Sequence, residues 1–190
     1  YWYCQEIGKT DGTGRFHPFL RGGATMKLSI LYYSKTGRTR DTALAIQRGA
    51  EKIEGMEAKA FPLDEIDEDF LKESRAVVFG TPTYLANTCW QIKKWFDESS
   101  KYKLEGKLGA AYATADYVQG GADTAIMNIV GHMLVKGMMV YSGGSALGQP
   151  YLHLGAVIVK DRMETGLSQA EIFGERIAKK AADLFAEGVD

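Results

Sequence analysis

Cysteine, proline and long apolar runs are scarce in this chain. Its 190 residues include two cysteines and four prolines, and Cys4 and Cys89 show neither a disulfide framework nor metal-ligand spacing. This favours a reducing, cytoplasmic setting and predicts no metal site. No apolar stretch approaches the length that spans a bilayer, and the first residues lack the basic-then-apolar order of a secretory signal.

An excess of charge of either sign is also missing. Lys and Arg number 23 against 24 Asp and Glu, which gives a formal net charge of −1. No basic stretch carries interleaved aromatic residues, so nucleic acid is a poor candidate partner. The hydrophobic fraction of 45% and the charged fraction of 25% are those of an ordinary globular domain, which at this length buries a core without disulfides.

The pattern of the sequence changes at Met26. Residues 1–25 are rich in glycine and polar residues, with Trp2, Phe16 and Phe19 scattered among them and no period of 2 or 3.6. We expect 1–25 to be an N-terminal extension, either added by cloning or from upstream, or else an arm that packs on a neighbouring surface. We expect 26–190 to be a single folded domain.

Strand-like and helix-like segments alternate five times after Met26. Short apolar runs predict strands at 28–33, 58–61, 76–80, 108–113 and 137–141, with 156–159 extending the fifth strand or pairing at the edge. Helical spacing predicts helices at 40–54, at 88–98 with Thr88 as N-cap, at 123–136, and from a Ser168–Glu171 capping box to about 186, with a short helical turn in 64–73. This alternation implies parallel crossovers and therefore an α/β sandwich. Ligands of such sheets bind at the carboxyl ends of the strands, so the loops after strands one, three and four should converge on one site.

The loop after the first strand is suited to a phosphate group. It consists of Ser34, Lys35, Thr36, Gly37, Arg38 and Thr39. Three hydroxyls and a glycine lie at a helix N-terminus, where free N–H groups and the helix dipole favour an anion, and the two basic residues either assist or face solvent. The alternative is an ordinary polar turn with Thr39 as the helix N-cap. The loop contains neither GxxxxGK[ST] nor GxGxxG, the patterns of other phosphate-binding turns.

The loop after the third strand is suited to a flat heteroaromatic ring. Its residues are Pro82, Thr83, Tyr84, Leu85, Ala86 and Asn87. A proline-stiffened turn offers a tyrosine for the ring face and backbone groups for its polar edge. The alternative is a loop whose tyrosine packs on a neighbouring helix.

The loop after the fourth strand again combines an aromatic residue with glycines. Its residues are Thr114, Ala115, Asp116, Tyr117, Gln119, Gly120 and Gly121, with Val118 between them. The N–H groups of the paired glycines would face a carbonyl edge and stabilise negative charge there. The alternative is a turn whose glycines only supply positive φ. Three such loops at three converging strand ends predict one ligand with a phosphate and a flat ring.

These three segments resemble those of the flavodoxin-like superfamily, and most of all its FMN-dependent NAD(P)H:quinone oxidoreductase branch, the tryptophan-repressor-binding-protein type. The resemblance covers roughly 26–186. It implies a three-layer sandwich, with a five-stranded parallel sheet in the order 2-1-3-4-5 and helices on both faces. It also implies that the first loop binds the FMN phosphate and that the other two bind the isoalloxazine ring.

This chain departs from that branch at two places, which bear on the substrate pocket and on assembly rather than on FMN binding. The branch often carries a histidine pair just before the fifth strand, where this chain has Val135-Lys136. The segment 99–106 is also short, whereas the branch often has an insertion there that helps tetramers form. We therefore expect a homo-oligomer, with a dimer favoured over a tetramer. His132 and His153 are weak candidates for a redox or proton-donor role, because FMN itself carries the chemistry.

Three functions remain open from the sequence. The first is an enzyme in which FMN takes a hydride from NADH or NADPH and reduces a quinone or a similar small-molecule acceptor. The second is a flavodoxin-type carrier that passes electrons to redox proteins. Such carriers are usually acidic, and residues 26–190 hold 20 basic and 22 acidic residues, so this near-neutral charge favours the enzyme. The third is a flavin-dependent interaction module.

Overall fold

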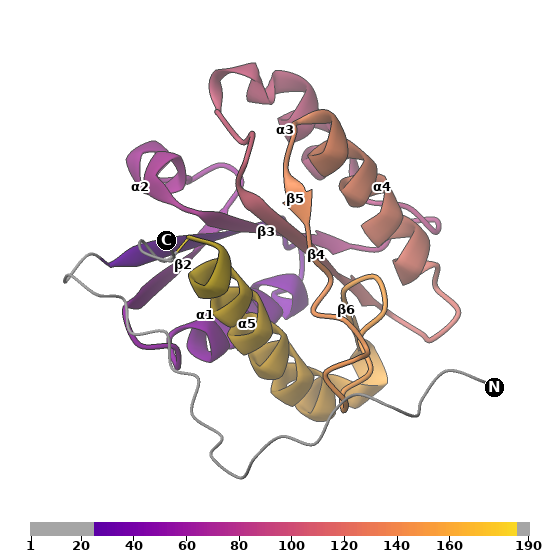
Figure 1. Ribbon diagram of the computed structural model, residues 1–190. Coiled ribbons are helices and arrows are strands. Elements are labelled where there is room, and N and C mark those ends of the chain that lie inside the picture. The colour runs from indigo at the N-terminus through magenta and orange to yellow at the C-terminus, as the bar shows by residue number, and fades with distance from the viewer. Residues whose placement is uncertain (1–24, 186–190) are drawn as a thin grey trace, which may run out of the picture.

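The computed structural model describes residues 25–185, and the predicted extension at 1–25 lies almost wholly outside them (Figure 1). The elements, in chain order, are β1 (Met26–Tyr32), α1 (Arg38–Ala50), β2 (Met56–Pro62), α2 (Glu68–Glu73), β3 (Ala76–Pro82), α3 (Trp90–Glu98), η1 (Ser99–Lys101), β4 (Leu108–Ala115), α4 (Ala122–Val135), β5 (Met139–Val140), β6 (Ala156–Val159), η2 (Lys160–Arg162) and α5 (Met163–Phe185). No helix within 25–185 is long and apolar enough to cross a membrane.

The strands form one parallel sheet in the order β2-β1-β3-β4-β5, which confirms the predicted order. The fifth position is shared by two short strands. β5 pairs with the start of β4 at Leu108–Gly109, and β6 pairs with its end, from Tyr112 to Ala115. Segment 156–159 is thus a separate strand that pairs with β4 at the edge, in line with β5, which confirms the second of the two predicted alternatives and makes the sheet six-stranded rather than five-stranded.

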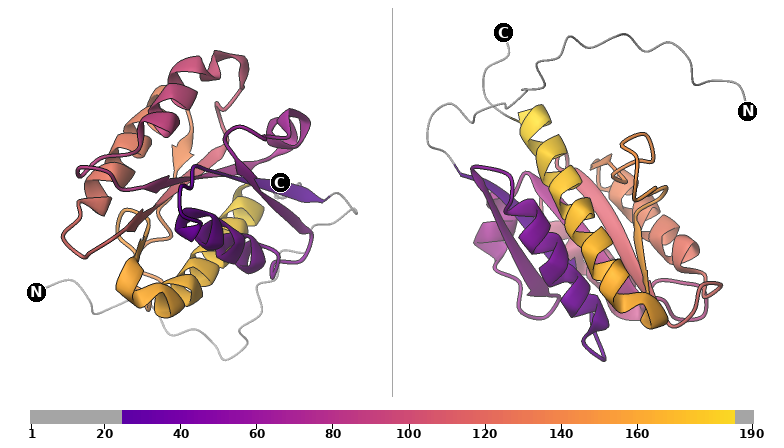
Figure 2. Two further views of the ribbon diagram at one scale, coloured as in Figure 1. Left: turned by 180° about the vertical axis from the view of Figure 1, so that it is seen from behind. Right: turned by 90° about the horizontal axis from the view of Figure 1, so that it is seen from below.

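Helices cover both faces of the sheet, as predicted. Helices α1 and α5 lie side by side on one face, and α3 and α4 cover the other (Figure 2). Each face has its own buried apolar cluster. One forms around Phe173 and Ile46, and the other around Phe79 and Phe96.

Two glycines let α1 and α5 touch backbone to backbone. A Cβ on Gly49 would lie 1.9 Å from the carbonyl oxygen of Glu171, and one on Gly174 would lie 2.0 Å from that of Ile46. Real Cβ atoms essentially never come closer than 3.0 Å. The crossing therefore depends on glycine at both positions.

The chain leaves the sheet between β5 and β6 in an excursion of residues 141–155. The Arg176 guanidinium, on α5, donates to the main-chain carbonyls of Gly144, Leu147, Gly148, Gln149 and Pro150, at 2.9 to 3.4 Å. One side chain thus satisfies five carbonyls of a loop that has no secondary structure of its own.

Two predicted helix starts are wrong. The N-cap of α3 is Cys89, because the Thr88 hydroxyl donates to Thr81 Oγ1 at 3.1 Å. The predicted capping box lies inside α5, which begins at Met163. There Ser168 Oγ donates back to the carbonyl of Glu164, while the Glu171 carboxylate accepts from Arg48.

Candidate functional site

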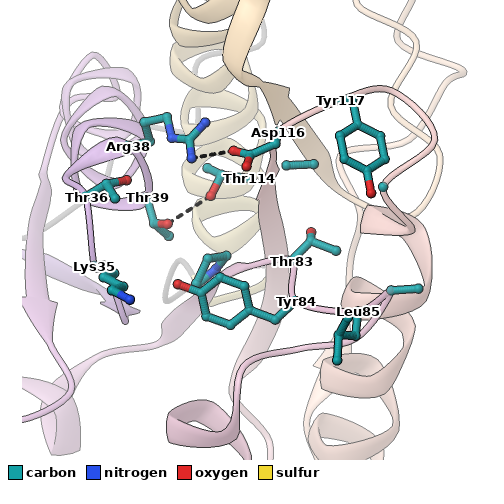
Figure 3. A pocket seen from close by; sticks show the side chains of 14 residues that line it. Lys35, Thr36, Arg38, Thr39, Thr83, Tyr84, Leu85, Thr114, Asp116 and Tyr117 are labelled. Carbon is teal, nitrogen blue, oxygen red and sulfur yellow. Dashed lines mark hydrogen bonds and ion pairs between the residues drawn. The ribbon is translucent and has the colours of Figure 1, made fainter.

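A cavity of 580 Å³ opens where β1, β3 and β4 end, as the convergence of their loops predicts (Figure 3). Its volume is within the range of small-molecule sites. Its lining consists of Lys35, Thr36, Arg38, Thr39, Pro82, Thr83, Tyr84, Leu85, Ala86, Thr114, Ala115, Asp116, Tyr117 and Gly120. All of these are predicted site residues. The other five predicted site residues, Ser34, Gly37, Asn87, Gln119 and Gly121, are not in this lining.

The first loop ends in a left-handed glycine. Gly37 has φ 94° and serves as the N-cap of α1, and its N–H donates to Ser34 Oγ at 3.1 Å. The predicted alternative, Thr39 as N-cap, is therefore wrong. The first backbone hydrogen bond of α1 runs from the Asp41 N–H to the Gly37 carbonyl, 2.8 Å. The N–H groups of the first turn of α1, at residues 38–40, are therefore left for an anion.

The three hydroxyls of this loop have different tasks. Ser34 caps its own turn, as described above, and Thr39 is buried, with its Oγ1 2.9 Å from Oγ1 of Thr114. Thr36 is exposed and lines the cavity. It is thus the hydroxyl of the three that is most open to a ligand.

The second loop is a two-residue turn with unusual backbone angles. Tyr84 and Asn87 exchange both main-chain hydrogen bonds at 3.0 Å, and Leu85 and Ala86 between them have φ of 50° and 57°. Positive φ is uncommon for residues other than glycine and marks local strain. Leu85 is fully exposed. The Asn87 side chain accepts from the Thr88 N–H at 2.7 Å, which accounts for its place outside the lining.

The third loop supports the second. A Cβ on Gly121, where φ is 83°, would lie 2.4 Å from that of Ala86. Only glycine therefore fits both the angle and the contact. Gly120 lines the cavity, whereas Gln119 is exposed outside it.

An ion pair joins the first and third loops across the cavity. Arg38 Nη2 lies 2.5 Å from Asp116 Oδ1, and dashed lines in Figure 3 mark this pair and the bond between Thr39 and Thr114. Tyr84 of the second loop and Tyr117 of the third expose 42% and 64% of their surface. Two aromatic side chains that are left this open can cover the faces of a planar ligand.

Two buried polar atoms of the lining have no partner within the described residues. They are Thr83 Oγ1 and Arg38 Nη1. Buried polar groups are nearly always hydrogen-bonded, so a ligand with acceptor atoms in this cavity would satisfy both. A cavity with an unpartnered hydroxyl, an unpartnered guanidinium nitrogen, a free helix N-terminus and two open aromatic rings fits a phosphorylated flavin.

Neither candidate histidine lines this cavity. His132 stacks on Phe96 with ring centroids 4.7 Å apart, and burial is the main cause that lowers its pKa below 6.5. His153 lines a separate cavity of 380 Å³ beside Tyr151 and Asp123. Residues 25–185 contain no group of three or more His, Cys, Asp or Glu side chains that could hold a metal ion.

Comparison with known proteins places the chain in a family. The Flavodoxin family model matches residues 30–131. A flavodoxin of Clostridium saccharobutylicum is 51% identical over 160 residues, which cover 84% of this chain and all of that protein.

The chain belongs to the flavodoxin family. An archaeal flavodoxin structure is similar, with a TM-score of 0.68 and 25% identity over 82% of this chain and 99% of that one. An NAD(P)H dehydrogenase (quinone) of Geotalea daltonii is 28% identical over 68% of this chain and 74% of its own length. The flavodoxin resemblance is thus confirmed, and the narrower quinone-reductase branch stays a prediction.

Two residues that support this flavodoxin-type site escaped the sequence analysis. Tyr112 and Gly80 face each other in β4 and β3, and Tyr112 reaches the first turn of α1. In the sequence, each reads as one more member of an apolar strand.

Proposed function

We propose that this chain is an electron-transfer carrier that binds FMN in the strand-end cavity. The observation that carries the proposal is the 51% identity to a flavodoxin over that protein's whole length. The chemistry of the cavity lining supports it independently, because each part of FMN meets suitable groups.

The phosphate end belongs at the first loop. The N–H groups of the first turn of α1 and the Thr36 hydroxyl would donate to phosphate oxygens. Arg38 would add positive charge, which Asp116 partly offsets at 2.5 Å. The charge at this end is therefore set by a pair of opposite charges rather than by arginine alone.

The ring end belongs at the other two loops. Tyr84 and Tyr117 would cover the ring faces and exclude water, while Thr83 Oγ1 and the main chain near Gly120 would meet its polar edge. When bound, FMN supplies one-electron redox chemistry. The residues of the chain bind it, orient it and limit its contact with solvent, and none of them is required to transfer a proton.

FMN titration of the apoprotein tests the proposal. Quenching of flavin fluorescence should give a saturable curve, and riboflavin should bind more weakly because it lacks the phosphate. Thr36→Val should weaken FMN binding about tenfold, the effect of one lost hydrogen bond to a charged group. Thr124→Val is the matched control, because Thr124 is exposed on α4 outside the cavity. No uptake of FMN by the parent protein would refute the proposal.

An NAD(P)H:quinone oxidoreductase is the second candidate function, favoured by the relative from Geotalea daltonii and by the near-neutral charge. Anaerobic mixing of the FMN form with NADH or NADPH separates the two. Slow bleaching, together with rapid electron exchange with a redox protein, supports the carrier. Fast bleaching with turnover of a quinone supports the enzyme. Size-exclusion chromatography of the same sample tests the predicted dimer.

A further inference from the structure

Tyr112 stands out among the buried side chains because its ring fills a space that Gly80 leaves open. The two residues pair in register in β4 and β3. A Cβ on Gly80 would lie 2.1 Å from Tyr112 Cζ and 2.2 Å from its hydroxyl. Tyr112 is fully buried, and its position over β3 therefore depends on glycine at residue 80.

The hydroxyl of Tyr112 reaches the start of α1. It donates to the main-chain carbonyl of Thr39 at 2.8 Å, and Thr39 is the second residue of α1. Two residues further along β4, Thr114 Oγ1 lies 2.9 Å from Thr39 Oγ1. Because residues i and i+2 of a strand point to the same face, β4 holds both the main chain and the side chain of Thr39.

The hydroxyl lies over Gly80 together with the end of the ring, but packing there does not require a polar atom, so the hydroxyl needs a separate explanation. Burying a hydroxyl is unfavourable unless it is hydrogen-bonded, and the bond that the structure gives this one ends on the first turn of α1. Burial also raises the pKa of Tyr112 well above its ordinary value. The phenol therefore stays a neutral donor.

We propose that Tyr112 is a positioning residue for the phosphate of the ligand. Its hydroxyl fixes how the first turn of α1 sits against β4, and so holds the N–H groups of that turn in place before the ligand arrives. The proposal rests on the proposed FMN function, because the phosphate is the part of FMN assigned to this turn. Because these N–H groups are already ordered in the apoprotein, binding costs less conformational entropy, and FMN affinity rises without any contact between Tyr112 and the ligand.

The test is Tyr112→Phe, which removes one oxygen and leaves the ring. FMN affinity should fall roughly fivefold to tenfold, as for one neutral hydrogen bond, whereas riboflavin affinity should change by less than about twofold. In the apoprotein, amide hydrogen exchange of residues 38–42 should become faster. Tyr141→Phe is the matched control. Tyr141 packs against the same apolar cluster as Tyr112 but lies just after β5.

The outcomes separate the two proposals. If the parent protein takes up no FMN, the proposed function fails. If the parent binds FMN and Tyr112→Phe binds FMN equally well, or loses FMN and riboflavin affinity in equal measure, the positioning role is overturned. A thermal melt of each apoprotein shows whether the variant is folded, and Gly80→Ala, which must displace the ring, should shift the ratio of the two affinities in the same direction.

Discussion

Replacing Gly174 with alanine should destabilise the apoprotein, although alanine is the better helix former. The gain in helix propensity is about 1 kcal/mol. Against it, the new Cβ would start 2.0 Å from the carbonyl oxygen of Ile46. To reach 3.0 Å, the closest approach that real Cβ atoms show, α1 and α5 must separate by about 1 Å along that direction.

The cost of that separation exceeds the gain. Overpacking of a buried contact typically costs about 1 to 3 kcal/mol and sometimes more, and a rigid backbone atom cannot turn away as a side chain can. A cost at the upper end of that range, about 3 kcal/mol, less the gain of about 1 kcal/mol gives a net loss of about 2 kcal/mol. With a urea m-value of about 2 kcal/mol/M, the midpoint of unfolding should fall by about 1 M.

Gly131 provides the matched control. It also lies inside a helix, α4, but a Cβ there would meet nothing within 4 Å. Gly131→Ala should therefore stabilise the protein by about 0.5 to 1 kcal/mol. Urea unfolding followed by circular dichroism measures both variants, with equal m-values as the check that only stability changed. Equal shifts for the two variants, or a higher midpoint for Gly174→Ala, would refute a backbone contact between α1 and α5.

Three further results are expected. Arg48, and then Lys52, lower the pKa of Glu171 below 4.5. A pKa that is lowered in the folded state stabilises the protein above about pH 4.5, and this stabilisation is lost as the pH falls. The urea midpoint of Glu171→Gln should therefore fall less steeply than that of the parent between about pH 5 and 3. NMR titration should give His132 a pKa below 6.5, because burial disfavours its charged form, and an ordinary or raised value would contradict its stacking on Phe96. Asp116→Asn removes the carboxylate that pairs with Arg38 and should tighten FMN binding severalfold at low salt, with a smaller gain at high salt; weaker binding would argue that the pair itself holds the site together.

Much of the fold follows from local patterns. Buried parallel strands read as short apolar runs, and their alternation with helices leaves few topologies open. The start of α5 did not follow, because Gly166 lies within its first turns and the sequence pattern favours a later start. The structure gives the reason: a Cβ at Gly166 would lie 2.8 Å from Ile158 Cγ2. Close packing on β6 thus outweighs the poor helix propensity of glycine.

The residues of the site also fall into those that the sequence predicts and those that it does not. The lining residues could be predicted because the carboxyl ends of parallel strands meet at one edge, whatever the length of chain between them. Ser34 and Asn87 are among the five predicted residues outside the cavity lining, and both hydrogen-bond within their own loops, so their contact with a ligand stays a prediction. Tyr112 could not be found, because its partner Thr39 is 73 positions away and no local pattern links them.

The shared fifth position of the sheet has a consequence for behaviour in concentrated solution. An exposed sheet edge is a template for pairing with another chain and so for aggregation. Here one edge is broken into runs of two and four residues by the excursion that Arg176 holds. The other edge, β2, carries charged Glu57 and Lys59 and ends at Pro62. Neither edge offers a long, flat, uncharged strand, so the fold itself discourages edge-to-edge assembly.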